Sequence, residues 1–179
     1  RMADDGVQRA LALVTSAYSS YSSCRQYRDD IQRACEQLGD RAPAVAKIRP
    51  FFNHPGLIET FVDRLQQALR QVPPTRHATT HLTFTAHSIP MAMADTCDYV
   101  RQLDEVLRLG TQSVGDYSAT LVYQSRSGPP AQPWLEPDSA TYAVHYGEHL
   151  FNTNQWNFAK AMRVQGIAVG RAERLGDTL

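Results

Sequence analysis

The chain has 179 residues, of which 42% are hydrophobic and 20% charged, so it is long enough to bury a core as one domain. Its 18 basic and 18 acidic residues cancel, which leaves no electrostatic reason for binding nucleic acid or an anionic membrane surface. It contains no apolar run of about 18 residues that could cross a membrane. Three cysteines cannot all pair, and residues 1–5 lack a secretory pattern. We therefore expect a soluble, cytoplasmic monomer.

Apolar and amphipathic segments alternate along the chain, a pattern typical of parallel βα units. Four nearly continuous apolar runs are predicted to form strands, at residues 10–17, 44–49, 82–86 and 117–124. Runs of this kind suit strands that are buried on both faces. The sequence therefore predicts a Rossmann-like α/β fold in which helices flank a mainly parallel sheet.

Three helices are predicted between these strands. The first is capped by Ser22 or Ser23 and ends at Gly39. The second covers residues 57–72, with Asn53 as a possible cap and two prolines after it. The third covers residues 98–109 and stops at Gly110.

One histidine, His87, is placed at the end of the third predicted strand, just before Pro90 stops that strand. In open α/β sheets ligands bind beyond the carboxyl ends of the strands. A neutral imidazole, with an unperturbed pKa of ~6.5, can accept a proton or hold a divalent cation. His87 is therefore the leading candidate for a functional residue.

Three blocks of sequence resemble one protein family. Residues 84–90 read Phe-Thr-Ala-His-Ser-Ile-Pro, and residues 121–138 contain Tyr-Gln-Ser, Gly-Pro and Pro-Trp-Leu in that order. Residues 15–28 form the third block, Thr-Ser-Ala-Tyr-Ser-Ser-Tyr-Ser-Ser-Cys-Arg-Gln-Tyr-Arg. In this order the blocks resemble the ferrochelatases, and the third resembles the actinobacterial branch of that family.

The resemblance implies Fe(II) insertion into a porphyrin between two Rossmann-like domains, with His87 as the metal-site histidine. The actinobacterial likeness favours coproporphyrin III over protoporphyrin IX. Residues 139–179 lack the block in which the family carries a glutamate opposite this histidine. We therefore expect a partial copy of the family fold, with residues 1–20 ending the first domain, 21–138 forming the core of the second, and 139–179 forming an atypical tail. The tail is expected to contribute one helix, at residues 154–164, and no strand that extends the sheet.

The resemblance also implies substrate contacts. Tyr18 and Tyr21 would lie at the edge of the porphyrin pocket, although packing beneath the loop is an equally good interpretation of both. Ser88, Gln124 and Ser125 would support His87 or the substrate from the neighbouring strand ends. Porphyrin and ferrous iron, as substrates, are the expected partners.

Cys24 aligns with a position at which some family members bind a [2Fe-2S] cluster through four cysteines. Because this chain has three cysteines in all, it cannot supply that set, and we expect a simple thiol and no resident cofactor. The remaining candidate residues are expected to have no role at the site. His77 and His81 are expected to be solvated, His145 and His149 to be exposed, and three arginines to form a solvated helix face in preference to binding propionates: Arg25, Arg28 and Arg33.

Two other functions stay open. The first is a catalytically inactive chelatase remnant that binds a tetrapyrrole or a partner, which the missing glutamate block favours. The second is a chelatase for another metal or tetrapyrrole, such as cobalt and sirohydrochlorin, which the block at residues 121–138 disfavours.

Overall fold

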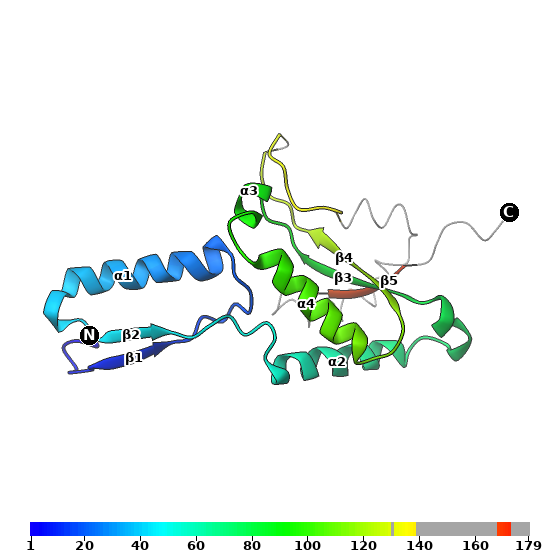
Figure 1. Ribbon diagram of the computed structural model, residues 1–179, viewed down its shortest axis with the longest axis horizontal. Coiled ribbons are helices and arrows are strands. Elements are labelled where there is room, and N and C mark those ends of the chain that lie inside the picture. Colours follow the sequence, from blue (N-terminus) through cyan, green and yellow to red (C-terminus); the bar gives the residue numbers. More distant parts are fainter. Residues whose placement is uncertain (130, 139–167, 173–179) are drawn as a thin grey trace.

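The computed structural model of the chain describes residues 1–129, 131–138 and 168–172. Figure 1 shows two parts that follow one another along the long axis of the molecule. Strands β1 and β2 with helix α1 make up the first part, and helices α2 and α4 with a second sheet make up the other. The predicted α/β fold with parallel strand pairs and flanking helices is confirmed, although the strands form two small sheets and not one.

The first part is a βαβ unit. Strand β1 (Arg9–Ala12) pairs in parallel with β2 (Ala44–Lys47), and α1 (Gln26–Leu38) connects them. The predicted parallel pairing is confirmed, although β1 is shorter than the apolar run. The unit spans residues 20 and 21, between which we expected a domain boundary.

The start of α1 differs from the prediction. A π-helical turn at Tyr21–Arg25 precedes it, and the N-cap is Arg25, whose side chain makes no capping bond. The predicted serine cap is therefore wrong, because the chain is already wound into a helical turn where those serines lie. The predicted stop is correct, since Gly39 at the C-cap has a φ of 56°, which favours glycine.

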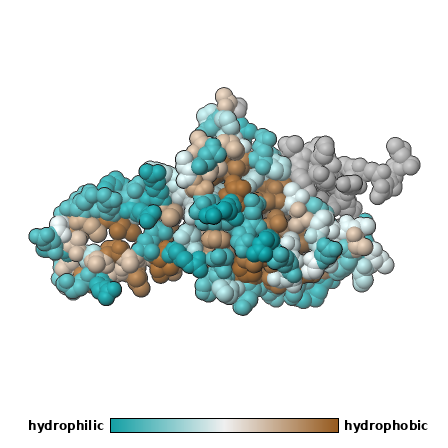
Figure 2. Space-filling model, viewed as in Figure 1, coloured by the Kyte–Doolittle hydropathy of each residue, from teal (hydrophilic) through white to brown (hydrophobic). Residues whose placement is uncertain are grey.

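One face of the first sheet is uncovered by the described residues. Leu11 is 77% exposed, Leu13 63% and Ile48 40%. Figure 2 shows hydrophobic residues along these strands beneath the hydrophilic α1. The prediction of burial on both faces is therefore wrong for this sheet. An apolar run indicates that a strand is suited to burial. It does not indicate whether another element covers that strand.

The second sheet has the order β4-β3-β5. Strand β3 (His81–His87) pairs in parallel with β4 (Ser118–Gln124), and residues 82–86 are all buried, as predicted. Strand β5 (Ala168–Ala172) pairs antiparallel with the other edge of β3. The prediction that residues 139–179 lack a strand is therefore wrong. The segment Ala-Val-Gly-Arg-Ala has no strand-like pattern, and it joins through backbone hydrogen bonds that any sequence can make.

The core lies between this sheet and two helices, α2 (Pro55–Leu69) and α4 (Tyr99–Gln112). A short 3₁₀ helix (Pro74–Thr79) follows α2, and the short helix α3 (Met91–Ala94) follows β3. No helix in the described part of the chain is long and apolar enough to span a membrane. The buried hydrophobic residues of these elements are Phe61, Leu65, Leu69, Leu82, Phe84, Ala86, Tyr99, Leu103, Val106, Val122 and Tyr123.

Two predicted helix ends were wrong. The N-cap of α2 is His54, whose Nδ1 accepts the Gly56 N–H at 3.2 Å, whereas the Asn53 side chain accepts a hydrogen bond from Arg49. Gly110 lies inside α4, where a Cβ would be 3.9 Å from the Phe84 ring. The glycine therefore does not end the helix, which continues to Gln112.

Replacing leucines on the covered and uncovered parts of the fold should have unequal effects on the 179-residue chain. Leu103→Ala should lower the free energy of unfolding by ~2–5 kcal/mol, because the side chain is 2% exposed. Leu11→Ala should change it by less than ~0.5 kcal/mol, because that side chain is 77% exposed. Urea denaturation followed by circular dichroism measures both, and equal losses would contradict the arrangement of the first sheet.

Candidate active site

His87 ends β3 beside Gln124, which ends β4. The five residues before His87 are buried, whereas the histidine itself is exposed. The strand therefore delivers an accessible imidazole to the carboxyl edge of a parallel pair, as predicted. This is the place at which open α/β sheets bind ligands.

The segment after His87 packs against the segment after β4. Ser88 donates its N–H to the Gln124 carbonyl at 2.7 Å and its hydroxyl to the Leu135 carbonyl at 3.1 Å. Leu135 in turn donates its N–H to the Ile89 carbonyl at 3.0 Å. The sequence blocks at residues 84–90 and 121–138 therefore meet in the fold.

The three polar residues expected beside His87 take different positions. Ser88 is 2% exposed and its hydroxyl is bonded to Leu135, so it fixes the backbone next to the histidine. Gln124 is half-buried at the adjacent strand end. Ser125 is exposed and has a φ of 63°, in the left-handed region that non-glycine residues seldom adopt. The chain thus turns sharply where β4 ends.

Tyr99, the first residue of α4, holds the backbone of His87. Its hydroxyl donates to the His87 carbonyl at 3.0 Å. Its ring meets Tyr18 edge to face, with ring centroids 6.0 Å apart and planes at 87°. Burial raises the pKa of both phenols well above the usual range for tyrosine, so both stay protonated at physiological pH.

Gln102, one helical turn later, holds the loop after β1. Its Oε1 accepts the Ser19 N–H at 2.7 Å, and its Nε2 donates to the Ser19 hydroxyl at 2.9 Å. The Gln102 side chain is buried. The block at residues 15–28 is thereby joined to the helix that contacts His87, so all three blocks converge.

The two tyrosines of that block differ in exposure. Tyr18 is 6% exposed and packs in the core, so the interpretation of packing beneath the loop applies to it. Tyr21 is 50% exposed and accessible to a ligand. Tyr99 and Gln102 were missed from the sequence. They share one helix face with the buried Leu103, Val106 and Gly110, and the signal was a glutamine on that otherwise apolar face.

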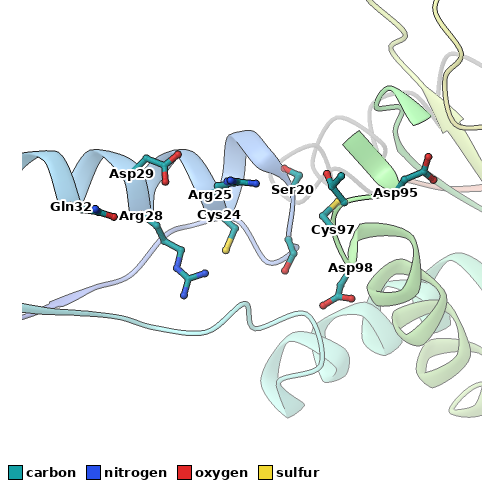
Figure 3. A pocket seen from close by; sticks show the side chains of 11 residues that line it. Ser20, Cys24, Arg25, Arg28, Asp29, Gln32, Asp95, Cys97 and Asp98 are labelled. Carbon is teal, nitrogen blue, oxygen red and sulfur yellow. The ribbon is translucent and has the colours of Figure 1, made fainter. Parts of the chain in front are cut away.

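A pocket of about 840 Å³ lies where the start of α1 faces the segment between α3 and α4 (Figure 3). Arg25 and Arg28 come from the α1 side, and Asp95 and Asp98 from the other. Cys24 and Cys97 also line the pocket. Of the arginines discussed above, Arg33 instead pairs with Asp30 on the surface.

The cysteines do not provide a cluster site by themselves. Cys24, Cys35 and Cys97 are free thiols, and they are all the cysteines of the chain. Within residues 1–129, 131–138 and 168–172, no three His, Cys, Asp or Glu side chains are grouped so that they could hold a metal ion. The four-thiolate donor set of a [2Fe-2S] cluster therefore does not fit the residues of this chain alone.

Two other histidines have structural roles, so the prediction that they are solvated is wrong. His77 donates from Nε2 to the Val72 carbonyl at 3.0 Å, and its Nδ1 lies 2.8 Å from the Tyr117 hydroxyl. His81 contacts the hydroxyls of Ser118 and Thr120 at 2.8 and 2.9 Å. Cross-strand and loop partners that are distant in sequence explain why a local pattern missed them. His145 and His149 lie outside the described residues.

A sequence model of the family described as Ferrochelatase matches residues 1–151. The chain belongs to the ferrochelatase family. It is 52% identical over 138 residues to a ferrochelatase of Rhodopirellula baltica, covering 77% of this chain and 39% of that protein. It is 47% identical over 145 residues to a coproporphyrin III ferrochelatase of Nocardia farcinica, covering 76% of this chain and 41% of that protein. It is 41% identical over 152 residues to a coproporphyrin III ferrochelatase of Mycolicibacterium smegmatis, covering 83% of this chain and 43% of that protein.

The ferrochelatase match contains all three blocks that suggested the family, at residues 15–28, 84–90 and 121–138. The recognition is therefore confirmed. The chain spans about two fifths of the length of these curated relatives.

The buried tyrosines make the stability of the chain sensitive to alkaline pH. Burial, assisted by the charge of Asp104, raises the pKa of Tyr123 from 10.0 to about 12. The unfolded chain releases this proton near pH 10 and the folded chain holds it until about pH 12, so the free energy of unfolding should fall between these values. Urea denaturation at about pH 9 to about pH 12 measures how steeply the free energy of unfolding falls with pH. Tyr123→Phe should reduce the slope, and Tyr27→Phe, at a 49% exposed position, should leave it unchanged.

Proposed function

We propose that this chain carries the histidine-bearing part of an enzyme that inserts Fe(II) into a porphyrin, with coproporphyrin III preferred over protoporphyrin IX. The convergence of the three ferrochelatase blocks on His87 carries the proposal. The names of the Nocardia and Mycolicibacterium relatives support the preference for coproporphyrin III. In this proposal residues 21–138 belong to the second domain of the family fold and residues 1–20 to the end of the first, as the family resemblance implies.

The reaction explains why an accessible imidazole is needed. The porphyrin releases two pyrrole N–H protons as its four nitrogens take up one Fe(II). His87, exposed at the strand end, can accept one of these protons or hold the incoming cation. A carboxylate across the macrocycle would accept the second proton. The family resemblance assigns that role to a glutamate in a block that this sequence does not contain.

Three accessible or half-buried side chains are available to contact a flat macrocycle in this proposal. Tyr21 offers an exposed aromatic ring, and Ser125 an exposed hydroxyl beyond β4. Gln124 contributes a half-buried amide at the adjacent strand end. Tyr18 supports this surface from the core. In this proposal Tyr21, Gln124 and Ser125 contact the porphyrin and Tyr18 fixes the loop that carries Tyr21.

An inactive chelatase remnant is the second candidate. It is favoured by the sequence of residues 139–179, which has no counterpart of the glutamate block. Such a protein would keep the tetrapyrrole surface beside His87 and would lack the second proton acceptor. Binding without turnover distinguishes it from the enzyme.

His87 should be essential once the rest of the fold is supplied. We would replace the matching segment of the Rhodopirellula baltica ferrochelatase with residues 1–138 and follow the loss of free-porphyrin fluorescence with coproporphyrin III and Fe(II) under anaerobic conditions. His87→Ala should lower kcat by ~10² to 10⁴-fold, because an acid–base group is lost. His54→Asn is the matched control, since it removes an exposed imidazole and keeps a side chain that can cap α2.

The outcomes separate the candidates. A fully active His87→Ala chimera would refute the site. A folded parent chimera that binds coproporphyrin III without metallating it would favour the remnant. We expect the 179-residue chain alone to insert little iron, since positioning across the macrocycle would be lost, and robust turnover by it would contradict the need for a second half. A higher kcat/KM for protoporphyrin IX would refute the substrate preference.

A further inference from the structure

We propose that Tyr99 is a positioning residue for His87. By holding the peptide unit that follows His87, Tyr99 sets the direction in which the imidazole side chain leaves the backbone. The inference rests on the proposed role of His87. Tyr99 lies in the core beneath the strand end and does not have to touch the substrate.

The two polar groups of one peptide unit are held from opposite elements. The His87 carbonyl accepts the Tyr99 hydroxyl of α4 at 3.0 Å, and the N–H of the same unit, on Ser88, donates to the Gln124 carbonyl of β4 at 2.7 Å. Because a peptide unit is planar, fixing both groups fixes its plane. Since the preceding backbone is held in β3, the ψ angle of His87 is then fixed as well. The direction of the His87 Cα–Cβ bond is fixed in turn, so the exposed imidazole is attached to a rigid backbone.

The donor itself is held in place. Tyr99 is 9% exposed and Tyr18 packs edge to face against its ring. Gln102, one turn further along α4, is bonded twice to Ser19. The first turn of α4 is therefore hydrogen-bonded both to the loop after β1 and to the end of β3. A shift of Tyr99 would require movement of both segments.

The hydroxyl stays a donor over the working range of an enzyme. Burial raises the pKa of the Tyr99 phenol above its ordinary value, with smaller contributions from Tyr123 and Cys97. The bond to the His87 carbonyl opposes this rise. The phenol is therefore protonated at neutral pH and does not compete with His87 for the protons of the reaction.

Tyr99→Phe removes this donor and retains the ring that packs against Tyr18. In the chimera described above, we expect kcat to fall by ~10-fold or more, up to the ~10²-fold that a misplaced catalytic group can cost, with the KM for coproporphyrin III unchanged. The fall should concern kcat because the porphyrin does not contact Tyr99 in this arrangement.

The matched control is Tyr117→Phe. It also removes a phenol that bonds inside the fold, here to His77 at 2.8 Å, and it leaves His87 untouched. Both variants should lose similar stability, because each loses one hydrogen bond inside the fold. In the 179-residue chain, amide hydrogen exchange at Ser88 should accelerate by ~5-fold in Tyr99→Phe, which corresponds to ~1 kcal/mol, and not in Tyr117→Phe.

These measurements separate two failures. If His87→Ala is inactive while Tyr99→Phe and Tyr117→Phe have equal kcat, Tyr99 is not a positioning residue. If His87→Ala is fully active, the proposed function fails instead. Should Tyr99→Phe not fold, 3,5-difluorotyrosine at position 99 keeps the ring and lowers the phenol pKa. The kcat must then decline at a lower pH than in the parent, and an unchanged pH profile would overturn the inference.

Discussion

The peptide unit between His87 and Ser88 is the constraint on which the rest of the site depends. It is bonded to α4 through its carbonyl and to β4 through its N–H. Around it, three segments that are far apart in the chain converge, because α4 also holds the loop after β1 and the segment after β4 packs on Ile89. An exposed side chain that is proposed to act in catalysis needs such a rigid backbone, since its own packing gives it little restraint.

The features that follow from local pattern were predictable. The apolar run at residues 82–86 forms the buried β3, His87 is accessible at its end, and β3 and β4 are parallel. The features set by distant partners were not. His77 and His81 are bonded to residues about forty positions away or to a neighbouring loop, β5 joins by backbone pairing, and α4 continues through Gly110 where it packs near Phe84.

The same division applies to the candidate site. The blocks at residues 84–90 and 121–138 revealed the family, because their residue types are specific in order and spacing. The connections between the blocks were hidden, since Tyr99 and Gln102 lie outside all three. Their roles depend on the approach of α4 to two other segments. A buried glutamine on a helix face is the kind of local inconsistency that marks such a contact.

The uncovered face of the β1–β2 sheet has a consequence for how the chain behaves in concentrated solution. Leu11, Leu13 and Ile48 present apolar surface that gains free energy, at ~25 cal/mol per Å², whenever another surface removes it from water. The formal net charge is +0 at pH 7, so no long-range repulsion opposes such contacts. Near neutral pH this small sheet, at one end of the molecule, is therefore a place where copies of the chain can associate through apolar contacts.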